Sequence, residues 1–311
     1  QGYAEQRTSR RFTWTTINSI EYNTALGDNE HFISAILQQS FQKNKSDAIS
    51  GSGEQPAAPG LYYLASFPTN RDVSGSFSDW RQLSYTGVFN YSFKDKYIAN
   101  FTWRNDGSSR FASGYRYGDF FSAGIAWNIS SENFLADSSI IDNLKFRASY
   151  GETGDSNISL NQYQSLFGYS GDYNDSGVVY PTAFGNGVIS WEKAEKLDLF
   201  LDFGLFNNRI VGSVGYYERN SKDLLQSVPL SLTTGFSSQV QNVGDVVNKG
   251  IEVEIDATLL KIGDFSWDIY GNYATVENEI TRLAQTADGE DINLDSFFYA
   301  NRVGRPMDTW F

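Results

Sequence analysis

Few side chains in this 311-residue sequence could carry out covalent chemistry. There is no cysteine, and His31 is the only histidine. Disulfides, thiolate chemistry and Cys/His catalytic groups are therefore excluded. A Ser/His pair would have to use His31, and no supporting motif accompanies it. His31 stands at the start of an expected strand, where a structural or interfacial role is the simpler interpretation.

Two acidic clusters are the remaining candidates for a metal site. Neither has the spacing of a calcium loop with its terminal glutamate. Solvated acidic loops explain both better, so the sequence predicts no enzyme, no metal and no other cofactor. The clusters comprise Asp288, Glu290, Asp291 and Asp295, and separately Asp172 and Asp175.

Aromatic side chains in polar loops are better candidates for binding a substrate. Tyr169, Tyr173 and Tyr180 lie among Gly and Asp in a long segment, residues 153–190. Sugar rings present apolar C–H faces that stack on aromatic rings, and nearby Asp and Asn could bind hydroxyl groups. Packing between loops, or contact with a covering protein, is the simpler explanation and stays open. Similar residues are Tyr62, Tyr63, Phe67, Phe297, Phe298 and Tyr299.

The elements that must hold these loops show an alternating pattern, clearest over residues 81–105. Tyr85, Phe89 and Tyr91 share one parity, and hydroxyl and amide side chains occupy the other. A period of two indicates β-strands, and the polar break at 94–96 predicts a tight turn of an antiparallel hairpin. One aromatic face and one polar face are what a membrane β-barrel needs, with lipid outside and a wet lumen inside.

The same pattern predicts about ten strands in five hairpins. Connections within a hairpin are short, and residues 131–142 are expected to form a compact turn with one helical turn at 132–135. Connections between hairpins are long and polar, at 44–80, 106–117, 153–190 and 220–248. Short turns at one end and long loops at the other are typical of outer-membrane barrels, whereas propellers and sandwiches are spaced more regularly. The expected strands are 10–23 with 31–43, 81–93 with 97–105, 118–130 with 143–152, 191–206 with 209–219, and 249–260 with 265–278.

Composition agrees with this all-β antiparallel barrel. The net charge of −13 argues against a nucleic-acid partner. Aromatic residues make up 16% of the chain, yet mean hydropathy is only −0.41, so apolar residues are dispersed by alternation. No apolar run approaches the roughly 18 residues of a membrane helix, which barrel strands do not require.

The strand expected at 249–260 tests the assignment. Glu252, Glu254 and Asp256 share one face, which cannot line a dry core without partners. They could line a lumen and pair across it with Lys145 and Arg147. By itself, this strand is better explained as the solvated face of an ordinary antiparallel sheet, because the sheets of soluble proteins alternate too. The aromatic load elsewhere favours the membrane, with lipid-facing or girdle positions at Phe101, Trp103, Trp127 and Trp267.

An ordered set of motifs adds a resemblance to a known family. Asp106-Gly-Ser-Ser-Arg-Phe111, Leu144-Lys-Phe-Arg, Trp191-Glu-Lys and Asn248-Lys-Gly-Ile follow one another in the order and spacing of the family. The sequence resembles the C-terminal barrel portion of SusC/RagA-type TonB-linked outer-membrane transporters of the Bacteroidetes, best over residues 80–280. Phe121, Asp155 and residues 185–190 depart from the family pattern, which affects loop detail only.

The resemblance implies a bacterial outer-membrane barrel of about 22 strands. It also implies an N-terminal plug, a TonB-contacting segment that meets the TonB complex, and a SusD-like surface lipoprotein. Residues 1–311 would be part of the barrel domain, with neither plug nor TonB box in this chain. Such transporters import oligosaccharides or peptides through the lipid bilayer. The alternatives are a scaffold subunit of a larger complex, a passive porin-like barrel and a soluble glycan-binding or glycan-cleaving protein.

Structural roles are expected for the motif residues. Asp106 and Gly107 favour a tight turn, and Arg104 and Arg110 are predicted to pair with loop carboxylates as a staple. Gly250 is predicted to mark a strand entry with a bulge or close backbone approach. The remaining motif positions expected to be structural are Phe111 and Trp191.

Overall fold

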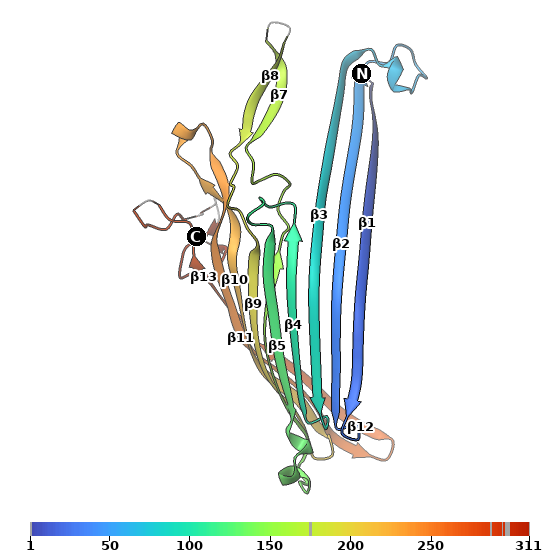
Figure 1. Ribbon diagram of the computed structural model, residues 1–311, viewed down its shortest axis with the longest axis vertical. Helices are drawn as coiled ribbons and strands as arrows, with labels where there is room; N and C mark the ends of the chain where they lie inside the picture. Colours follow the sequence, from blue (N-terminus) through green and yellow to red (C-terminus); the bar gives the residue numbers. More distant parts are fainter. Residues whose placement is uncertain (1, 174–175, 287, 294, 296–298, 311) are drawn as a thin grey trace.

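The computed structural model describes residues 2–310, except 174–175, 287, 294 and 296–298. One 11-stranded antiparallel sheet dominates it, in the order β1-β2-β3-β4-β5-β6-β9-β10-β11-β12, and β13 continues beside β11. Figure 1 shows these strands as a tall curved wall. The sheet is not closed, because β1 and β12 lie at its two ends.

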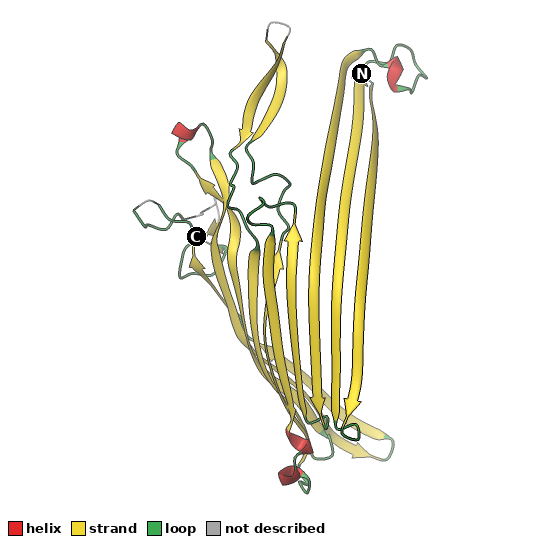
Figure 2. Ribbon diagram, in the orientation of Figure 1, coloured by secondary structure: helices red, strands yellow, loops and turns green. Residues whose placement is uncertain are grey.

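The strands are β1 (Tyr3–Leu26), β2 (His31–Glu54), β3 (Thr69–Phe93), β4 (Tyr97–Ser108), β5 (Tyr117–Asn128), β6 (Ile141–Asp155), β7 (Leu166–Tyr173), β8 (Ser176–Ala183), β9 (Glu192–Leu205), β10 (Ile210–Pro229), β11 (Ser238–Ile262), β12 (Phe265–Ala274), β13 (Glu277–Arg282), β14 (Tyr299–Ala300) and β15 (Thr309–Trp310). Short 3-10 helices occupy connections: η1 (Leu64–Ser66), η2 (Ile129–Ser131), η3 (Asn133–Leu135) and η4 (Leu232–Thr234). Figure 2 shows them at the two ends of the wall. Among the described residues, no helix has the length and apolar character needed to cross a membrane.

All five predicted hairpins are confirmed, but several strands are longer than predicted. Residues 44–80 were expected to be a loop, and most of them are strand, since β2 runs to Glu54 and β3 starts at Thr69. Likewise β10 and β11 extend through most of residues 220–248. These extensions are rich in Ser, Gly, Asn and Asp and lack apolar alternation. Backbone hydrogen bonds to a long neighbouring strand stabilise these extensions, and such bonds need no apolar side chains.

Two further features differ from the expectation. The long loop 153–190 contains a separate two-stranded hairpin, β7–β8, which projects beyond the wall. The strand expected at 265–278 is interrupted, because β12 ends at Ala274 and β13 starts at Glu277. Both segments pair with β11, so they form one interrupted neighbour of it.

The tight turns gather at one end of the wall, as the sequence predicts. Left-handed backbone occurs at Asn29, Asp95, Asn207 and Asn208, where φ is 68°, 54°, 58° and 54°. Asn and Asp tolerate this conformation, which explains the choice of residues. The compact turn after β5 is also confirmed and contains η2 and η3.

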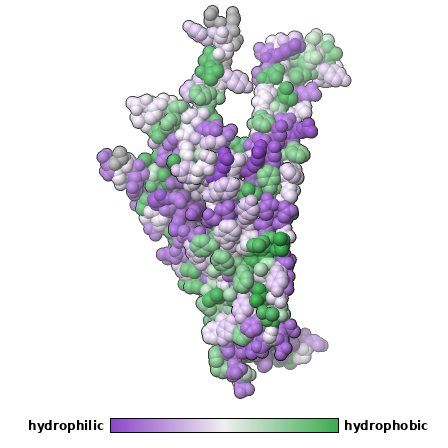
Figure 3. Space-filling model, in the orientation of Figure 1, coloured by the Kyte–Doolittle hydropathy of each residue, from purple (hydrophilic) through white to green (hydrophobic). Residues whose placement is uncertain are grey.

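The buried apolar core lies at the opposite end, among the long loops. Phe111 and Ile189 are fully buried and pack with Phe120, Ile158 and Trp191. A smaller cluster forms beside β13, and it comprises Val246, Ile280 and Leu283. Among the described residues, the middle of the wall has no such buried apolar core, because both of its faces are open. Figure 3 shows apolar residues gathered in the lower part of the wall, with hydrophilic residues above them and along the lower edge.

Candidate functional site

The polar face of the wall carries the first candidate site. Strand pairing places Asn90, Asn100, Gly124, Ser149 and Asp198 in one row across β3, β4, β5, β6 and β9. Two hollows of about 910 and 760 Å³ lie along this face and share several lining residues. The shared lining is therefore a continuous polar surface with both charge signs. Its charged members are Lys196, Asp198 and Arg219.

Ion pairs on this face join β6 to β9 and also join two positions of β9 itself. Arg147 of β6 donates to both carboxylate oxygens of Asp202 on β9, at 2.6 and 2.8 Å. Its guanidinium carbon also lies 5.1 Å from the centroid of the Phe200 ring. Lys196 pairs with Asp198 at 3.0 Å. Arg147 and Lys196 are thus each paired with a carboxylate of the wall.

The expected pairing across the lumen is wrong for Arg147. The register of β6 and β9 places Arg147 opposite Phe200 and Lys145 opposite Asp202, so a carboxylate is available one strand away. Within the described part of the chain, no ion pair joins Lys145 or Arg147 to the acidic face of β11. Glu254 instead accepts a hydrogen bond from Tyr270 on the adjacent strand, at 3.2 Å.

The motif at residues 106–111 covers the end of β4 and the turn that follows, at the loop end of this face. Asp106 and Gly107 are paired strand residues, so the tight turn expected at these two positions is wrong. Arg104 Nε lies 2.7 Å from Asp106 Oδ2, and Asp106 is only 5% exposed. Arg110 does not pair with Asp106; it donates to the Ile158 carbonyl at 2.6 Å, and its guanidinium lies 5.1 Å from the Trp80 ring centroid. The staple therefore joins this turn both to its own strand and to the loop after β6.

Aromatic side chains pack together at the same loop end of the polar face. The Trp191 ring lies 5.3 Å from Phe111 and 5.6 Å from Phe120, and its Nε1 donates to the Arg116 carbonyl at 3.1 Å. A Cβ at Gly154 would overlap the Phe120 ring. Phe120 and Trp191 also line the larger hollow. The long loop before β9 is therefore folded back against the wall beside the hollow.

Two motif glycines allow close approach. A Cβ at Gly107 would overlap the Tyr117 ring, and a Cβ at Gly250 would overlap the Thr275 carbonyl oxygen. Tyr217 donates to that same carbonyl at 3.1 Å. Gly250 lies in the middle of β11, so the expected strand entry is wrong, but the close backbone approach is confirmed.

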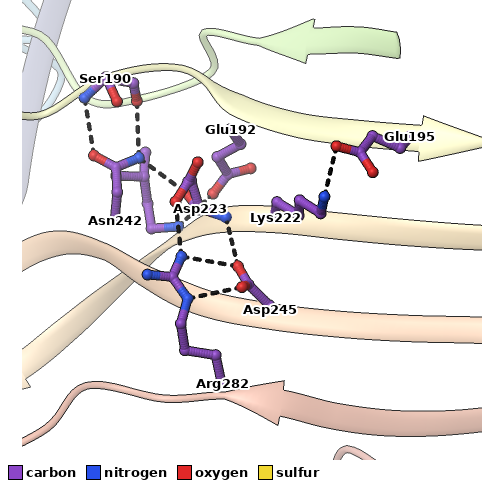
Figure 4. A network of polar contacts seen from close by, with 9 residues as sticks. Ser190, Glu192, Glu195, Lys222, Asp223, Asn242, Asp245 and Arg282 are labelled. Carbon is purple, nitrogen blue, oxygen red and sulfur yellow. Dashed lines mark hydrogen bonds and ion pairs between the residues drawn. The ribbon is translucent and has the colours of Figure 1, made fainter. Parts of the chain in front are cut away.

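A polar network joins the loop before β9 to strands β10, β11 and β13 (Figure 4). The Asn242 amide accepts from Ser190 N at 2.9 Å and donates to Ser190 O at 2.9 Å and to Asp223 O at 2.8 Å. Arg282 of β13 bonds Asp223 at 2.7 Å and Asp245 at 2.7 and 2.9 Å. The network thus spans from the loop before β9 to β13.

The network forms around an irregularity in β10. Asp223 has φ of 55°, and the register against β11 shifts between Ser221 and Leu224. Asp223 N donates to Asp245 Oδ1 at 2.9 Å. No motif in the sequence predicts this site. Asp223, Asn242 and Asp245 are far from Arg282 in the sequence, and their spacing gives no signal that they meet.

The candidate binding tyrosines lie away from both hollows. Tyr169, Tyr173 and Tyr180 sit on the projecting β7–β8 hairpin and are 83%, 80% and 45% exposed. At the base of the hairpin, Phe184 stacks on Phe236 of the β10–β11 connection at 5.4 Å. The hairpin is therefore an aromatic arm fixed at its base. Of the other aromatic candidates, Phe297 and Phe298 lie outside the described residues.

Two acidic residues near the end of the chain bond to different partners and do not share a site. Asp295 pairs with Arg302 at 2.8 Å, and this hydrogen bond lowers the pKa of Asp295. Asp291 accepts from Gln285 at 3.1 Å. Within residues 2–310 and outside the gaps named above, no group of three or more His, Asp or Glu side chains is placed to hold a metal ion. Asp175 lies outside the described residues.

Comparison with known proteins decides the family. The sequence matches the "TonB dependent receptor-like, beta-barrel" family over residues 1–310. The chain belongs to the TonB-dependent receptors. This receptor is 36% identical over 285 residues to TonB-dependent receptor P3 of Formosa agariphila, covering 90% of this chain and 28% of that protein. It is 39% identical over 217 residues to TonB-dependent receptor SusC of Bacteroides thetaiotaomicron, covering 67% of this chain and 22% of that protein.

Solved structures agree with the family. The RagAB peptide importer in its closed-closed state matches with a TM-score of 0.88 and 27% identity, over 98% of this chain and 34% of that one. The ferric citrate transporter FecA, with a TM-score of 0.52 and 12% identity, shows the shared fold alone. The chain spans between about a fifth and two fifths of the length of these relatives. The receptor is a SusC/RagA-like β-barrel protein of the outer membrane, in a family of transporters and not of enzymes.

Proposed function

We propose that this chain forms part of the barrel wall of a TonB-dependent importer of oligosaccharides or peptides, which works with a SusD-like surface lipoprotein and the TonB complex. The observation that carries the proposal is the division of the wall into an apolar and a polar face. Strand pairing aligns one uninterrupted row of mostly apolar side chains across eight strands. The row comprises Ile33, Tyr91, Ala99, Ile125, Ala148, Leu199, Tyr216 and Ile251.

The height of the apolar face fits a membrane. Tyr85 and Phe93 share this face of β3 and are eight positions apart, which is about 27 Å along the strand at roughly 3.4 Å per residue. For a barrel strand tilted by about 40°, this corresponds to about 21 Å across the membrane. The apolar band of a membrane barrel is about 25 Å tall. Above it, the same face becomes polar, and Asn105 donates to Asp119 at 3.0 Å. These dimensions support lipid contact for the exposed aromatic residues, which are Phe101, Trp103, Trp127 and Trp267.

The polar face suits a water-filled lumen. Lys196, Asp198 and Arg219 would be costly against lipid, because unpaired or partly paired charges are poorly solvated in hydrocarbon. Facing water, they offer carboxylate, ammonium and guanidinium groups to polar solutes. Oligosaccharides and peptides both present dense hydrogen-bonding groups, so either would interact favourably with such a wall.

The loop end suits capture of a substrate. The aromatic arm of β7–β8 exposes Tyr169, Tyr173 and Tyr180 beyond the wall, where they could stack on a sugar or peptide or contact a lipoprotein lid. One similar solved structure is a peptide importer, which supports the peptide class.

Uptake measurements with energy controls test this proposal. The full-length receptor, expressed with its neighbouring lipoprotein, should take up fluorescent oligosaccharides or peptides, and uptake should stop when TonB is deleted or the membrane potential is collapsed. Uptake that continues without TonB would indicate a passive pore. No uptake of either class, with the protein folded in the outer membrane, would indicate a scaffold subunit and contradict the proposal.

A further inference from the structure

The turn between β5 and β6 contacts the apolar face of the wall. Glu132, between η2 and η3, accepts hydrogen bonds from Tyr97 Oη at 2.6 Å and from Trp127 Nε1 at 3.1 Å. Lys96 Nζ lies 3.4 Å from the same carboxylate. These contacts lower the pKa of Glu132, led by the Tyr97 hydrogen bond. One carboxylate therefore binds three side chains at the short-turn end.

The side of the wall on which Glu132 lies follows from strand register. Tyr97 is paired with Trp127, and both share the parity of Phe101 and Trp103 on β4. This is the apolar face, so a carboxylate bonded to both rings lies on that side and not on the lumen side. The turn is thus held against the outer surface of the barrel, at the lower edge of the apolar band.

The rings beside Glu132 form a belt. His31, Phe93, Tyr97 and Trp127 follow one another, with ring centroids 4.6, 6.3 and 6.4 Å apart. Rings with a polar atom at one end favour the membrane–water boundary, where one part is apolar and the other hydrated. Next to this belt, Phe134 of η3 exposes 71% of its surface.

We propose that the 129–140 turn is an interfacial membrane anchor, with Phe134 inserted among phospholipid headgroups and Glu132 as the positioning residue that holds the turn against the barrel. The occupant is lipid because Glu132 holds the turn against Tyr97 and Trp127, which belong to the apolar face of an outer-membrane protein. Ile140 on the same turn is also 51% exposed, and its carbonyl accepts from Phe206 of the next turn at 2.8 Å. The proposal depends on outer-membrane placement and not on transport.

Lipid photolabelling of the unmodified protein tests it. The full-length receptor would be reconstituted in phosphatidylethanolamine and phosphatidylglycerol vesicles containing a phospholipid with a diazirine near its headgroup. After illumination, mass spectrometry should find label in residues 129–140 as well as in the peptides around Phe101 and Trp103. Label around Phe101 and Trp103 without label in the turn would overturn the anchor. No label in either region would refute the lipid-facing wall itself.

Spin labels on single cysteines give a second, graded test, helped by the absence of native cysteine in this chain. A nitroxide at Phe134→Cys should collide more with oxygen than with a nickel chelate, and one at Asp137→Cys on the same turn serves as the matched comparison. Adding Glu132→Ala should shift the Phe134 label toward nickel accessibility, whereas Glu132→Gln, which keeps an acceptor oxygen, should shift it less. Equal nickel accessibility at 134 and 137, or no shift with Glu132→Ala, would contradict the proposal.

Discussion

Replacing Phe111 by Ala should release the long loop before β9 without unfolding the wall. Phe111 is fully buried and packs on Trp191, and neither residue lies in the middle of the strand ladder. Truncation of a buried Phe to Ala typically costs about 3–5 kcal/mol. Because strand pairing of the wall does not depend on this ring, the cost should fall on opening of the local cluster.

The expected magnitude follows from that cost. An opening free energy lowered by about 3–5 kcal/mol corresponds to faster amide exchange by about two to four orders of magnitude, up to the limit of full local opening. Hydrogen exchange with mass spectrometry should show this over residues 156–165 and 184–191. Exchange in β4 and β5 should change little, since their ladder remains intact.

A matched control is available in the same loop. Phe167 of β7 is 66% exposed. Phe167→Ala should therefore change the opening free energy of the loop by less than the roughly 0.5 kcal/mol typical of surface positions, and amide exchange should hardly change. Unchanged exchange of the loop in Phe111→Ala would refute the assignment of Phe111 as its anchor. If Phe111→Ala instead increased amide exchange equally across the loop and the strands of the wall, the idea that the loop opens independently of the strands would be wrong.

Two further substitutions test close approach and the polar network. Gly250→Ala should place a methyl group against the Thr275 carbonyl and lower the free energy of unfolding by about 1–3 kcal/mol. The measurement is the urea midpoint of the protein in vesicles, which should fall. Gly271→Ala has open space around the new methyl group and should leave the midpoint unchanged. Asn242→Ala should remove the three hydrogen bonds that the Asn242 side chain makes to Ser190 and Asp223. At about 1 kcal/mol for each bond, limited proteolysis before β9 should accelerate; an unchanged cleavage rate would contradict the pinning role.

The faces of the wall and the position of its turns were predictable from local pattern. Alternation over 81–105 places Tyr97 and Trp103 on one face whatever the partner strand, because successive side chains leave a strand on opposite sides. Asn207-Asn208 predicts a tight turn because both residues tolerate left-handed backbone. Strand ends were less predictable. The polar upper parts of β2 and β3 hold their place by pairing with each other.

Side-chain partners could not be predicted in the same way. Arg147 meets Asp202, 55 positions away, only because the β6–β9 register places them on adjacent strands. Arg282 meets Asp245 because the β11–β13 register pairs them, and it reaches Asp223 where β10 is irregular. A one-residue change of register would reverse the face of each of these side chains, and composition does not set the register.

The sequence by itself therefore determined that this chain is an antiparallel barrel wall with an apolar and a polar face, and its ordered motifs indicated the family. Only the tertiary structure decided that Phe111 and Trp191, 80 positions apart, form one core, and that Glu132 lies on the apolar side. The physical reason is range. Alternation and turn chemistry act within a few residues, whereas packing and ion pairing depend on how distant strands are aligned.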